Sequence, residues 1–250
     1  LGIKKQGPRF WRKTMSKETV FIITGASGGI GKALMEILYS KYLNAYFILV
    51  QRSETCVESS RVLTIVQDFS CLSEKPFFSG RPYDHIIHAK EVFLLLCSGT
   101  IMPIGKVGTF EATAIKNNVL VNVLASAQII NESVHIAKGK LKIIHLDSGA
   151  AYRPIDGWAL YCAAKAYLSL YLRTLQEENN ARVVCFDPGV VDTKMQRQIR
   201  MTSPEQCKDA HIFHSYYEQG QLRSPNEIAL QIEERYVSQW SAKEICEKIW

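Results

Sequence analysis

The sequence predicts a single α/β domain in which a mostly parallel, doubly wound sheet carries helices on both faces. Three observations predict it. Short apolar runs recur along the chain, helical stretches separate them, and a glycine-rich turn joins the first run to the first helix. Apolar runs without alternation indicate strands that are buried on both faces of a sheet. The 250 residues suffice for one such domain with a substantial core.

Six apolar runs predict the strands. They are VFIITG from Val20, AYFILV from Ala45, VLTIV from Val62, VFLLLC from Val92, LKIIHL from Leu141 and ARVVCF from Ala181. Between the first two runs, apolar residues recur at spacings of three and four, which predicts an amphipathic helix. Residues 111–137 and 158–178 behave similarly, and right-handed crossovers then give a doubly wound order. Residues 71–90, with two prolines and a glycine, are a poor helix and have no clear place in this order.

The net charge of +6 is concentrated at the start of the chain. Five basic residues and no acidic ones lie within residues 1–14, and the rest is nearly neutral, so we expect no nucleic-acid partner. No uninterrupted apolar run reaches the roughly 20 residues that cross a bilayer, so we expect no membrane span. We expect residues 1–14 to be a basic disordered tail, upstream translated sequence, a basic targeting arm or a cloning remnant, and residues 15–250 to form the domain.

The cysteine and histidine patterns argue against disulfides and metals. Seven cysteines are scattered without a CxxC pair, which is typical of thiols in a reducing compartment, so we expect a cytoplasmic protein. His85 with His88 and His211 with His214 form two spaced pairs, but no cysteine or carboxylate cluster completes a metal site. We therefore predict no metal.

The first strand runs directly into TGASGGIG, residues 24–31, and then into a helix. Glycines let the backbone turn sharply and approach a pyrophosphate, while the free amides and positive dipole of a helix start favour its charge. A glycine pattern alone also fits an ordinary tight turn. The order of strand, glycines and amphipathic helix favours a nucleotide site.

The residue after the second strand lies where the adenosine ribose of a dinucleotide would bind. An acidic group there accepts a hydrogen bond from the 2′-hydroxyl, whereas a guanidinium pairs with a 2′-phosphate. The chain supplies Arg52 and no acid, which favours NADP over NAD, although a solvated surface arginine is the alternative. Asp68, after the third strand, is placed to hydrogen-bond the adenine amino group, but an aspartate there is also a common turn residue.

Three residues of DSGAAYRPIDGWALYCAAK, residues 147–165, predict the chemistry. Ser148 follows the fifth strand at the carboxyl edge of the sheet, where open α/β folds bind ligands, and its hydroxyl can hold a substrate carbonyl. Tyr161 and Lys165 are four residues apart and share one helix face. The lysine ammonium should lower the tyrosine pKa from about 10 and favour general acid catalysis. A packed tyrosine with a solvated lysine would show the same spacing.

After the sixth strand, PGVVDT, residues 188–193, turns over the expected nicotinamide site, and Thr193 is placed to contact the carboxamide. With these motifs the chain resembles the classical short-chain dehydrogenase/reductases over roughly residues 19–230. TGASGGIG matches their TGxxxGxG turn, and Ser148, Tyr161 and Lys165 match their catalytic triad by spacing. The fourth catalytic residue of the family is an asparagine that holds a water near the lysine, matched best by Asn122, with Asn118 as the alternative.

The resemblance implies a Rossmann fold and a homodimer or homotetramer. It also implies cofactor contacts at Gly25, Ser27, Gly28, Gly29, Ile30, Gly31, Arg52, Asp68, Phe69, Gly99, Tyr161, Lys165, Pro188, Gly189, Val191 and Thr193. Within the family, SGAAYRPIDGWALYCAAKA, DPGVVDTKMQRQIR and YYEQGQLRSPNEIA are similar to the sepiapterin reductase and benzil reductase branch.

That similarity implies an NADPH-dependent carbonyl reductase that transfers a hydride to a ketone or vicinal dicarbonyl, with Tyr161 as the general acid. Two alternatives remain at this stage. One is a reductase of hydroxysteroid or acyl-carrier ketones, and the other is a catalytically weak NADP-binding regulatory or interaction protein.

The sequence departs from the family pattern at three places. Two of them, LCSG and the C-terminal sequence, motivate the non-catalytic alternative, and the third changes the charge beside the reaction site. The family's NNAG is replaced by LCSG, residues 96–99, which removes an asparagine that ties strands together. Asp147 stands where many relatives have a second serine, and its carboxylate is expected to disfavour anionic substrates. The final QWSAKEICEKIW lacks the glycine that precedes the family's last strand, which puts a seventh strand in doubt.

Overall fold

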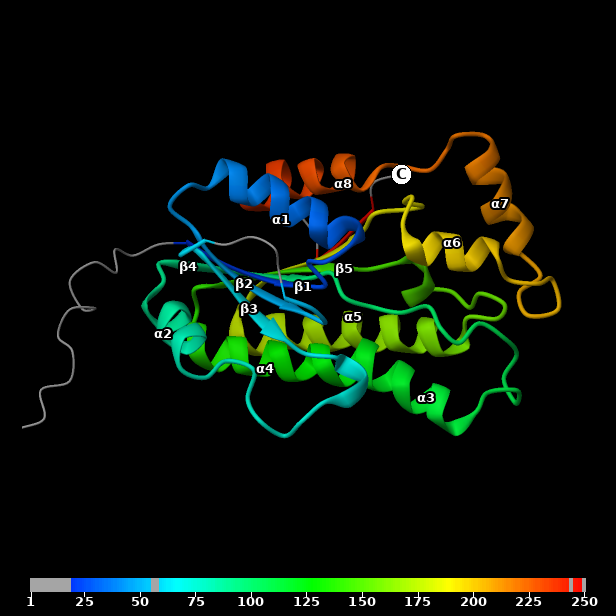
Figure 1. The fold of residues 1–250 in the computed structure, drawn as a ribbon, viewed down its shortest axis with the longest axis horizontal. Coiled ribbons are helices and arrows are strands. Elements are labelled where there is room, and N and C mark those ends of the chain that lie inside the picture. Colours follow the sequence, from blue (N-terminus) through cyan, green and yellow to red (C-terminus); the bar gives the residue numbers. More distant parts are fainter. Residues whose placement is uncertain (1–18, 55–58, 243–244, 249–250) are drawn as a thin grey trace, which may run out of the picture.

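The computed structural model describes residues 19–54, 59–242 and 245–248, so the predicted tail at residues 1–14 lies outside the described residues. The chain forms one parallel sheet of seven strands in the order β3-β2-β1-β4-β5-β6-β7, with helices on both faces (Figure 1). The predicted doubly wound α/β fold is confirmed. The strand order reverses between β1 and β4, and both strands pair in parallel throughout their length.

The six predicted apolar runs are the first six strands. The strands are β1 Thr19–Thr24, β2 Tyr46–Gln51, β3 Val62–Val66, β4 Glu91–Leu96, β5 Leu141–Leu146, β6 Arg182–Asp187 and β7 Cys246–Lys248. β2 is buried at every residue, and β1, β4 and β6 at every residue but the first, as expected for strands covered on both faces.

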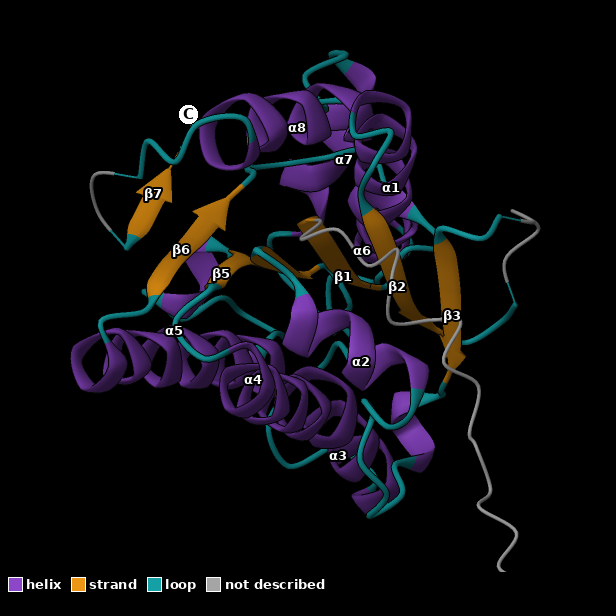
Figure 2. Cartoon of the chain, turned by 90° about the vertical axis from the view of Figure 1, so that its left-hand side faces the viewer, coloured by secondary structure: helices purple, strands orange, loops and turns teal. Residues whose placement is uncertain are grey.

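Two helical layers cover the sheet (Figure 2). One face carries α1, Gly29–Lys41, and α8, Pro225–Ile232. The other carries α2, Arg81–His88, α3, Ala112–Val119, α4, Ala125–Ala137, and α5, Ala159–Asn179. Two short helices, α6, Lys194–Arg200, and α7, Ala210–Glu218, follow β6 and lie at one end of the molecule (Figure 1).

Each face of the sheet has its own hydrophobic core. Toward α1 and α8, the ring of Phe21 stacks on those of Phe47 and Phe93, with centroids 5.3 and 5.2 Å apart. Toward α4 and α5, strand residues such as Ile22 and Leu94 pack with helix residues such as Ile129. Burial of these side chains on both faces fixes the strands in register, because a one-residue slip would reverse every one of them.

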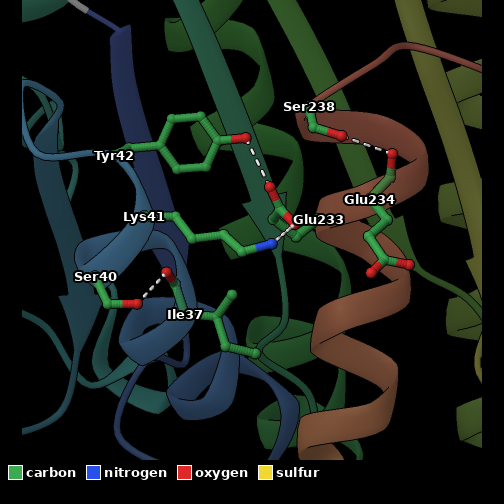
Figure 3. Close-up of polar contacts among 7 residues, drawn as sticks. All are labelled: Ile37, Ser40, Lys41, Tyr42, Glu233, Glu234 and Ser238. Carbon is green, nitrogen blue, oxygen red and sulfur yellow. Dashed lines mark hydrogen bonds and ion pairs between the residues drawn. The ribbon is translucent and has the colours of Figure 1, made fainter.

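The layer formed by α1 and α8 is joined by one buried carboxylate. Lys41 and Tyr42, at the end of α1, both point to Glu233 in a π-helical segment, Glu233–Val237, that continues α8 (Figure 3). The Lys41 ammonium lies 2.5 Å from Oε2 and the Tyr42 hydroxyl donates to Oε1 at 2.8 Å. Glu233 is almost fully buried, so these two partners offset the cost of removing its charge from water.

Residues 71–90 do contain regular structure. Phe69–Cys71 form a 3-10 turn, and Arg81–His88 form α2. Gly80 precedes α2 with a φ of 65°, and Pro82 lies in the first helical turn, where its missing amide hydrogen costs nothing. The proline and glycine that make the segment a poor helix by sequence therefore mark the start of one.

The doubt about a seventh strand was misplaced. β7 pairs in parallel with β6, with Cys185 opposite Cys246, and the amide of Cys185 donates to the Ile245 carbonyl. This pairing is made by backbone groups, so it does not depend on the glycine that the sequence lacks.

The continuous helical stretch Ala112–Ala137 is long and apolar enough to cross a membrane by length and composition alone. In the structure its α4 portion packs on the sheet, with Ile129, Ile130 and Ile136 in the core. These contacts are those of a core helix.

The substitution of LCSG for NNAG does not separate β1 from β4. The hydroxyl of Thr24, at the end of β1, accepts hydrogen bonds from the amides of Cys97 and Ser98 at 3.0 and 3.1 Å. The Ser98 hydroxyl lies 3.0 Å from the same oxygen. A threonine hydroxyl thus holds the two strand ends together without the asparagine.

Replacing Thr24 by valine should lower the free energy of unfolding by about 3 kcal/mol, because two amides at the sheet edge lose their acceptor. Thr24→Ser, which keeps the hydroxyl, is the matched control and should change it by about 1 kcal/mol or less. Denaturant unfolding of both variants measures the difference. Equal losses in the two variants would contradict a role for the hydroxyl.

Candidate active site

The sequence-predicted site residues gather at one end of the sheet. The glycine turn follows β1, Gly99 follows β4, Ser148 follows β5, and Pro188, Gly189 and Val191 follow β6. Because the strands are parallel, their carboxyl ends share one edge, on the side where α6 and α7 lie (Figure 1).

The glycine turn has no room for side chains at two positions. A Cβ on Gly31 would lie 2.4 Å from the Gly25 carbonyl oxygen, and one on Gly25 would lie 3.0 Å from the backbone of Ser98. Gly25 also has a φ of 68°, which disfavours other residues. The turn is therefore packed tightly against both α1 and the loop after β4.

The start of α1 is built to receive an anion. Gly28 precedes the helix with an extended backbone, no side chain caps the first amides, and the first turn contains no acid. Ser27, Gly28 and Gly29 are exposed, whereas Ile30 is buried in the core. Amides at such a helix start, together with its dipole, suit the pyrophosphate of a dinucleotide. These residues fit the predicted cofactor.

Thr193, in the segment after β6, lies close to this turn. Its Cγ2 would be 3.3 Å from a Cβ on Gly29, and its hydroxyl caps α6 by accepting from the Gln196 amide at 3.4 Å. The segment after β6 is thereby brought onto the glycine turn. Two motifs more than 160 residues apart in sequence meet at one place.

Arg52 and Asp68 lie at the carboxyl ends of β2 and β3. Arg52 is exposed. Hydrogen bonds from the Ser70 amide and hydroxyl, at 2.9 and 2.8 Å, lower the pKa of Asp68 below its usual value, and the Arg52 charge lowers it further. Asp68 Oδ1 therefore caps the 3-10 turn, and the adenine contact stays a prediction. The neighbouring Phe69 is buried in the core with its ring 6.0 Å from that of Phe77.

Ser148 and Tyr161 form a hydrogen-bonded pair. Ser148 precedes the 3-10 turn Gly149–Ala151, and its Oγ accepts from the Ala150 amide at 3.2 Å. Tyr161 lies in the first turn of α5 and is buried, and hydrogen bonding to the Ser148 hydroxyl lowers the pKa of its phenol. The spacing of thirteen residues in the sequence thus becomes direct contact.

Lys165 lies beneath Tyr161, as its position one helical turn later predicts. Its Nζ is 5.6 Å from the centre of the tyrosine ring and donates to the Leu146 carbonyl at 2.5 Å. Burial lowers the pKa of Lys165, and the nearby carboxylate of Asp147 opposes that change.

The pKa of Tyr161 is raised overall, and not lowered as the sequence predicts. Burial raises the pKa of Tyr161 above its usual value, and the carboxylates of Asp147 and Asp187 raise it further, because both oppose a phenolate. The Ser148 hydrogen bond lowers it only in part. Tyr161 therefore keeps its proton through neutral pH.

The two carboxylates beside the site have fixed positions of their own. Asp147 is buried, and its Oδ2 accepts from Tyr152 and Ser169 at 2.8 and 2.7 Å. Asp187 Oδ1 accepts from the Gly189 amide at 3.0 Å. Asp147 was considered from sequence only as a charge facing the substrate, and Asp187 was missed. The sequence does contain a signal for both carboxylates. Asp147 directly follows the apolar run of β5, and Asp187 is the last residue of β6.

Asn122 and Asn118 support the loop after β4. Asn122 lies in a π-helical segment, Leu120–Leu124, between α3 and α4, and both ends of its side chain bind the Thr100 backbone at 2.8 Å. Asn118 donates to the Met102 carbonyl at 2.8 Å. A Cβ on Gly99 would meet Asn122 Oδ1 at 3.4 Å, which is an ordinary van der Waals distance. The side chain of Asn122 thus positions this loop, and the bound water stays a prediction.

The wall beside Tyr161 is aromatic, which the sequence analysis does not predict. The ring of Trp158 meets Tyr161 edge-on at 5.9 Å and packs against Phe213 of α7 at 5.1 Å. Phe213 in turn meets Tyr216 at 6.3 Å. The signal was present in the aromatic residues of the segment after β6, but the sequence did not show that Trp158 faces them.

The described residues contain no group of three or more histidine, cysteine, aspartate or glutamate side chains that could hold a metal. Five cysteines in the described ranges form no disulfide: Cys71, Cys97, Cys162, Cys185 and Cys207. Cys56 lies outside the described residues. Burial raises the pKa of Cys97 to about 12, so this thiol beside the glycine turn is not ionised at neutral pH.

A family model described as short chain dehydrogenase matches residues 19–204. The chain therefore belongs to the short-chain dehydrogenase family, which comprises oxidoreductases that act on carbonyl and CH–OH groups.

Within the family, the chain is similar to benzil reductase ((S)-benzoin forming) of Bacillus subtilis, at 28% identity over 84% of this chain and 90% of that protein. It is 26% identical to sepiapterin reductase of Bos taurus, over 74% of this chain and 77% of that one. The predicted branch is confirmed. The crystal structure of the KRED1-Pglu enzyme superposes with a TM-score of 0.73 at 22% identity, covering 88% and 96% of the two chains, which shows the shared fold.

Proposed function

We propose that this protein is an NADPH-dependent carbonyl reductase of the cytoplasm that reduces aryl ketones or vicinal dicarbonyls. The observation that carries the proposal is a buried, protonated Tyr161 hydrogen-bonded to Ser148 with Lys165 beneath it. The similarity to benzil and sepiapterin reductases supports the substrate class.

Ser148 and Tyr161 would bind the substrate oxygen together. Their hydroxyls can both donate to a carbonyl oxygen placed between them, which polarises the carbonyl and orients its carbon. When bound, NADPH supplies the hydride that the carbonyl carbon receives. Tyr161 then transfers its phenolic proton to the oxygen, which completes the alcohol.

Lys165 acts on the phenolate that this proton transfer leaves. Its ammonium lies under the ring, in a site removed from water, where the attraction between opposite charges is strong. Asp147 and Asp187 oppose the phenolate, so Tyr161 is driven to recover a proton after each turnover. The cofactor would be held by the glycine turn, the start of α1 and the segment at Thr193.

The non-catalytic alternative loses its motivation. It rested on LCSG and on the unusual C-terminal sequence, but Thr24 joins β1 to β4 and β7 completes the sheet. The aromatic wall of Trp158 and Phe213 supports flat aryl substrates over extended acyl-carrier ketones, because stacked rings favour flat groups.

Tyr161→Phe should reduce turnover of benzil with NADPH by at least about 10³-fold, because the proton donor is lost while the ring stays in place. Nicotinamide absorbance follows turnover, and fluorescence titration follows NADPH binding, which should change by less than about threefold. Wild-type protein that binds NADPH but reduces neither benzil, a phenyl-substituted propanedione nor sepiapterin would overturn the proposal.

The pH profile of the same assay tests the proton donor. Since the pKa of Tyr161 is raised, the active protonated form persists as pH rises, and kcat for reduction should stay within about twofold from pH 7 to pH 9. A fall in kcat centred below pH 9 would show instead a tyrosine whose pKa is lowered.

Arg52 should give NADPH at least a tenfold preference over NADH, which corresponds to about 1.4 kcal/mol and is modest for one charge-assisted contact to a 2′-phosphate. Arg52→Asp should reverse the preference by placing an acceptor for the 2′-hydroxyl at the same position. The ratio of kcat/KM for the two cofactors measures it. If the wild type and Arg52→Asp have the same ratio of kcat/KM for NADPH and NADH, Arg52 does not select the cofactor.

We propose further that α4 and α5 join two copies of the chain. The described fold leaves apolar side chains uncovered on α5, at Tyr167 and Leu170, the latter 66% exposed, and at Leu124 in the π-helical segment that leads into α4. Light scattering should give a mass of twice 28.3 kDa or a larger multiple for the wild type and a smaller mass for Leu170→Glu. Leu43→Glu, at an equally exposed leucine after α1, is the control and should keep the wild-type mass.

A further inference from the structure

Three consecutive residues before α5 hold the segment that follows α6. We call Asp156, Gly157 and Trp158 the docking triplet and residues 201–213 the covering segment. Asp156 Oδ2 accepts from the Lys208 amide at 2.9 Å. Trp158 packs its ring on Phe213, with centroids 5.1 Å apart.

The central residue of the docking triplet must be glycine. A Cβ on Gly157 would lie 2.3 Å from the Gln206 carbonyl oxygen and 3.1 Å from Cys207 Cβ. Its φ of 78° also disfavours a side chain. The covering segment therefore packs on bare backbone at this point, and Asp156 and Trp158 hold it on either side.

The carboxylate of Asp156 also engages a third loop. Lys106, in the loop after β4, places its Nζ 2.5 Å from Asp156 Oδ1, and the neighbouring Gly105 amide donates to the Gly157 carbonyl at 2.9 Å. The loops after β4, β5 and β6 thus meet at one side chain. The Lys106 hydrogen bond, followed by that of the Lys208 amide, lowers the pKa of Asp156, so the carboxylate is ionised at neutral pH.

This junction lies next to the reacting group. Trp158 meets Tyr161 edge-on, and both belong to a small hydrophobic cluster with residues of all three loops. Further members of the cluster are Ile101, Ile104, Ile199, Cys207 and Ala210. A hollow of about 470 Å³ opens between the loop after β4 and the covering segment, with Lys106 and Gln206 among its lining residues. A shift of the covering segment would therefore change the wall beside the Tyr161 hydroxyl.

We propose that Asp156 is a positioning residue: by joining the three loops, it holds Trp158 and Phe213 as a fixed wall that selects carbonyl substrates with a flat aryl group. Asp156 does not touch the reacting atoms. The substrate part of this inference rests on the proposed function, whereas the positioning part does not.

Asp156→Asn removes the charge and keeps the shape of the side chain, and Lys106→Met removes only the ion pair. For benzil, whose rings need the wall, Asp156→Asn should raise KM about tenfold and Lys106→Met about threefold. We expect kcat and NADPH affinity to stay within about twofold of the wild-type values. Butanedione has no ring, so its KM should also stay within about twofold of the wild-type value. Glu36→Gln breaks an exposed ion pair with Lys32 on α1 and is the matched control that should change none of these values.

Hydrogen exchange tests the positioning without any substrate. The amides of residues 205–213 should exchange at least about tenfold faster in Asp156→Asn than in the wild type or in Glu36→Gln. Unchanged exchange would overturn the positioning role. An equal rise in KM for benzil and butanedione, or a fall in kcat at constant KM, would overturn the selection of aryl substrates. If the wild-type protein reduces neither benzil nor butanedione, the proposed function is refuted. Hydrogen exchange then still tests the positioning role of Asp156.

Discussion

The site depends on the junction of β1 and β4, where the strand order reverses. Thr24 accepts the amides that begin the loop after β4, and Gly25 lies against the backbone of Ser98 in that loop. Gly31, at the start of α1, packs on the Gly25 carbonyl and on Cys97. The glycine turn and the loop after β4 are therefore two parts of one packed unit. The backbones of these two segments are so close at Gly25 and Gly31 that neither position has room for a Cβ atom.

Burial is the main cause of the raised pKa of Tyr161. The sequence alone predicts that a lysine one helical turn away lowers the pKa of Tyr161, since an ammonium favours a phenolate. In the folded protein, both groups leave water, and removal from water disfavours the charged form of each. Asp147 and Asp187 add to this effect for Tyr161 and oppose it for Lys165. Tyr161 is consequently a neutral phenol at neutral pH. It lies beside the Lys165 ammonium, whose charge is stabilised by the carboxylates of Asp147 and Asp187.

Features encoded locally could be predicted from the sequence. Continuous apolar runs gave β1 to β6, and the spacing of Tyr161 and Lys165 placed them on one face of α5. What could not be predicted arises from contacts between distant segments. β7 forms through backbone pairing with β6, which has no side-chain signature. Asp156 is an ordinary loop aspartate in the sequence, and it gains its role only because the fold brings Lys106 and the Lys208 amide to it.

The arrangement also favours one direction of reaction. Reduction of a carbonyl requires a tyrosine that holds a proton, whereas oxidation of an alcohol requires a phenolate to accept one. Each carboxylate near Tyr161 raises the free energy of the phenolate, and burial raises it further. The ammonium of Lys165 limits this cost but is itself buried and hydrogen-bonded to the Leu146 carbonyl. At neutral pH the proton therefore remains on Tyr161, which is the form that the proposed reduction would use.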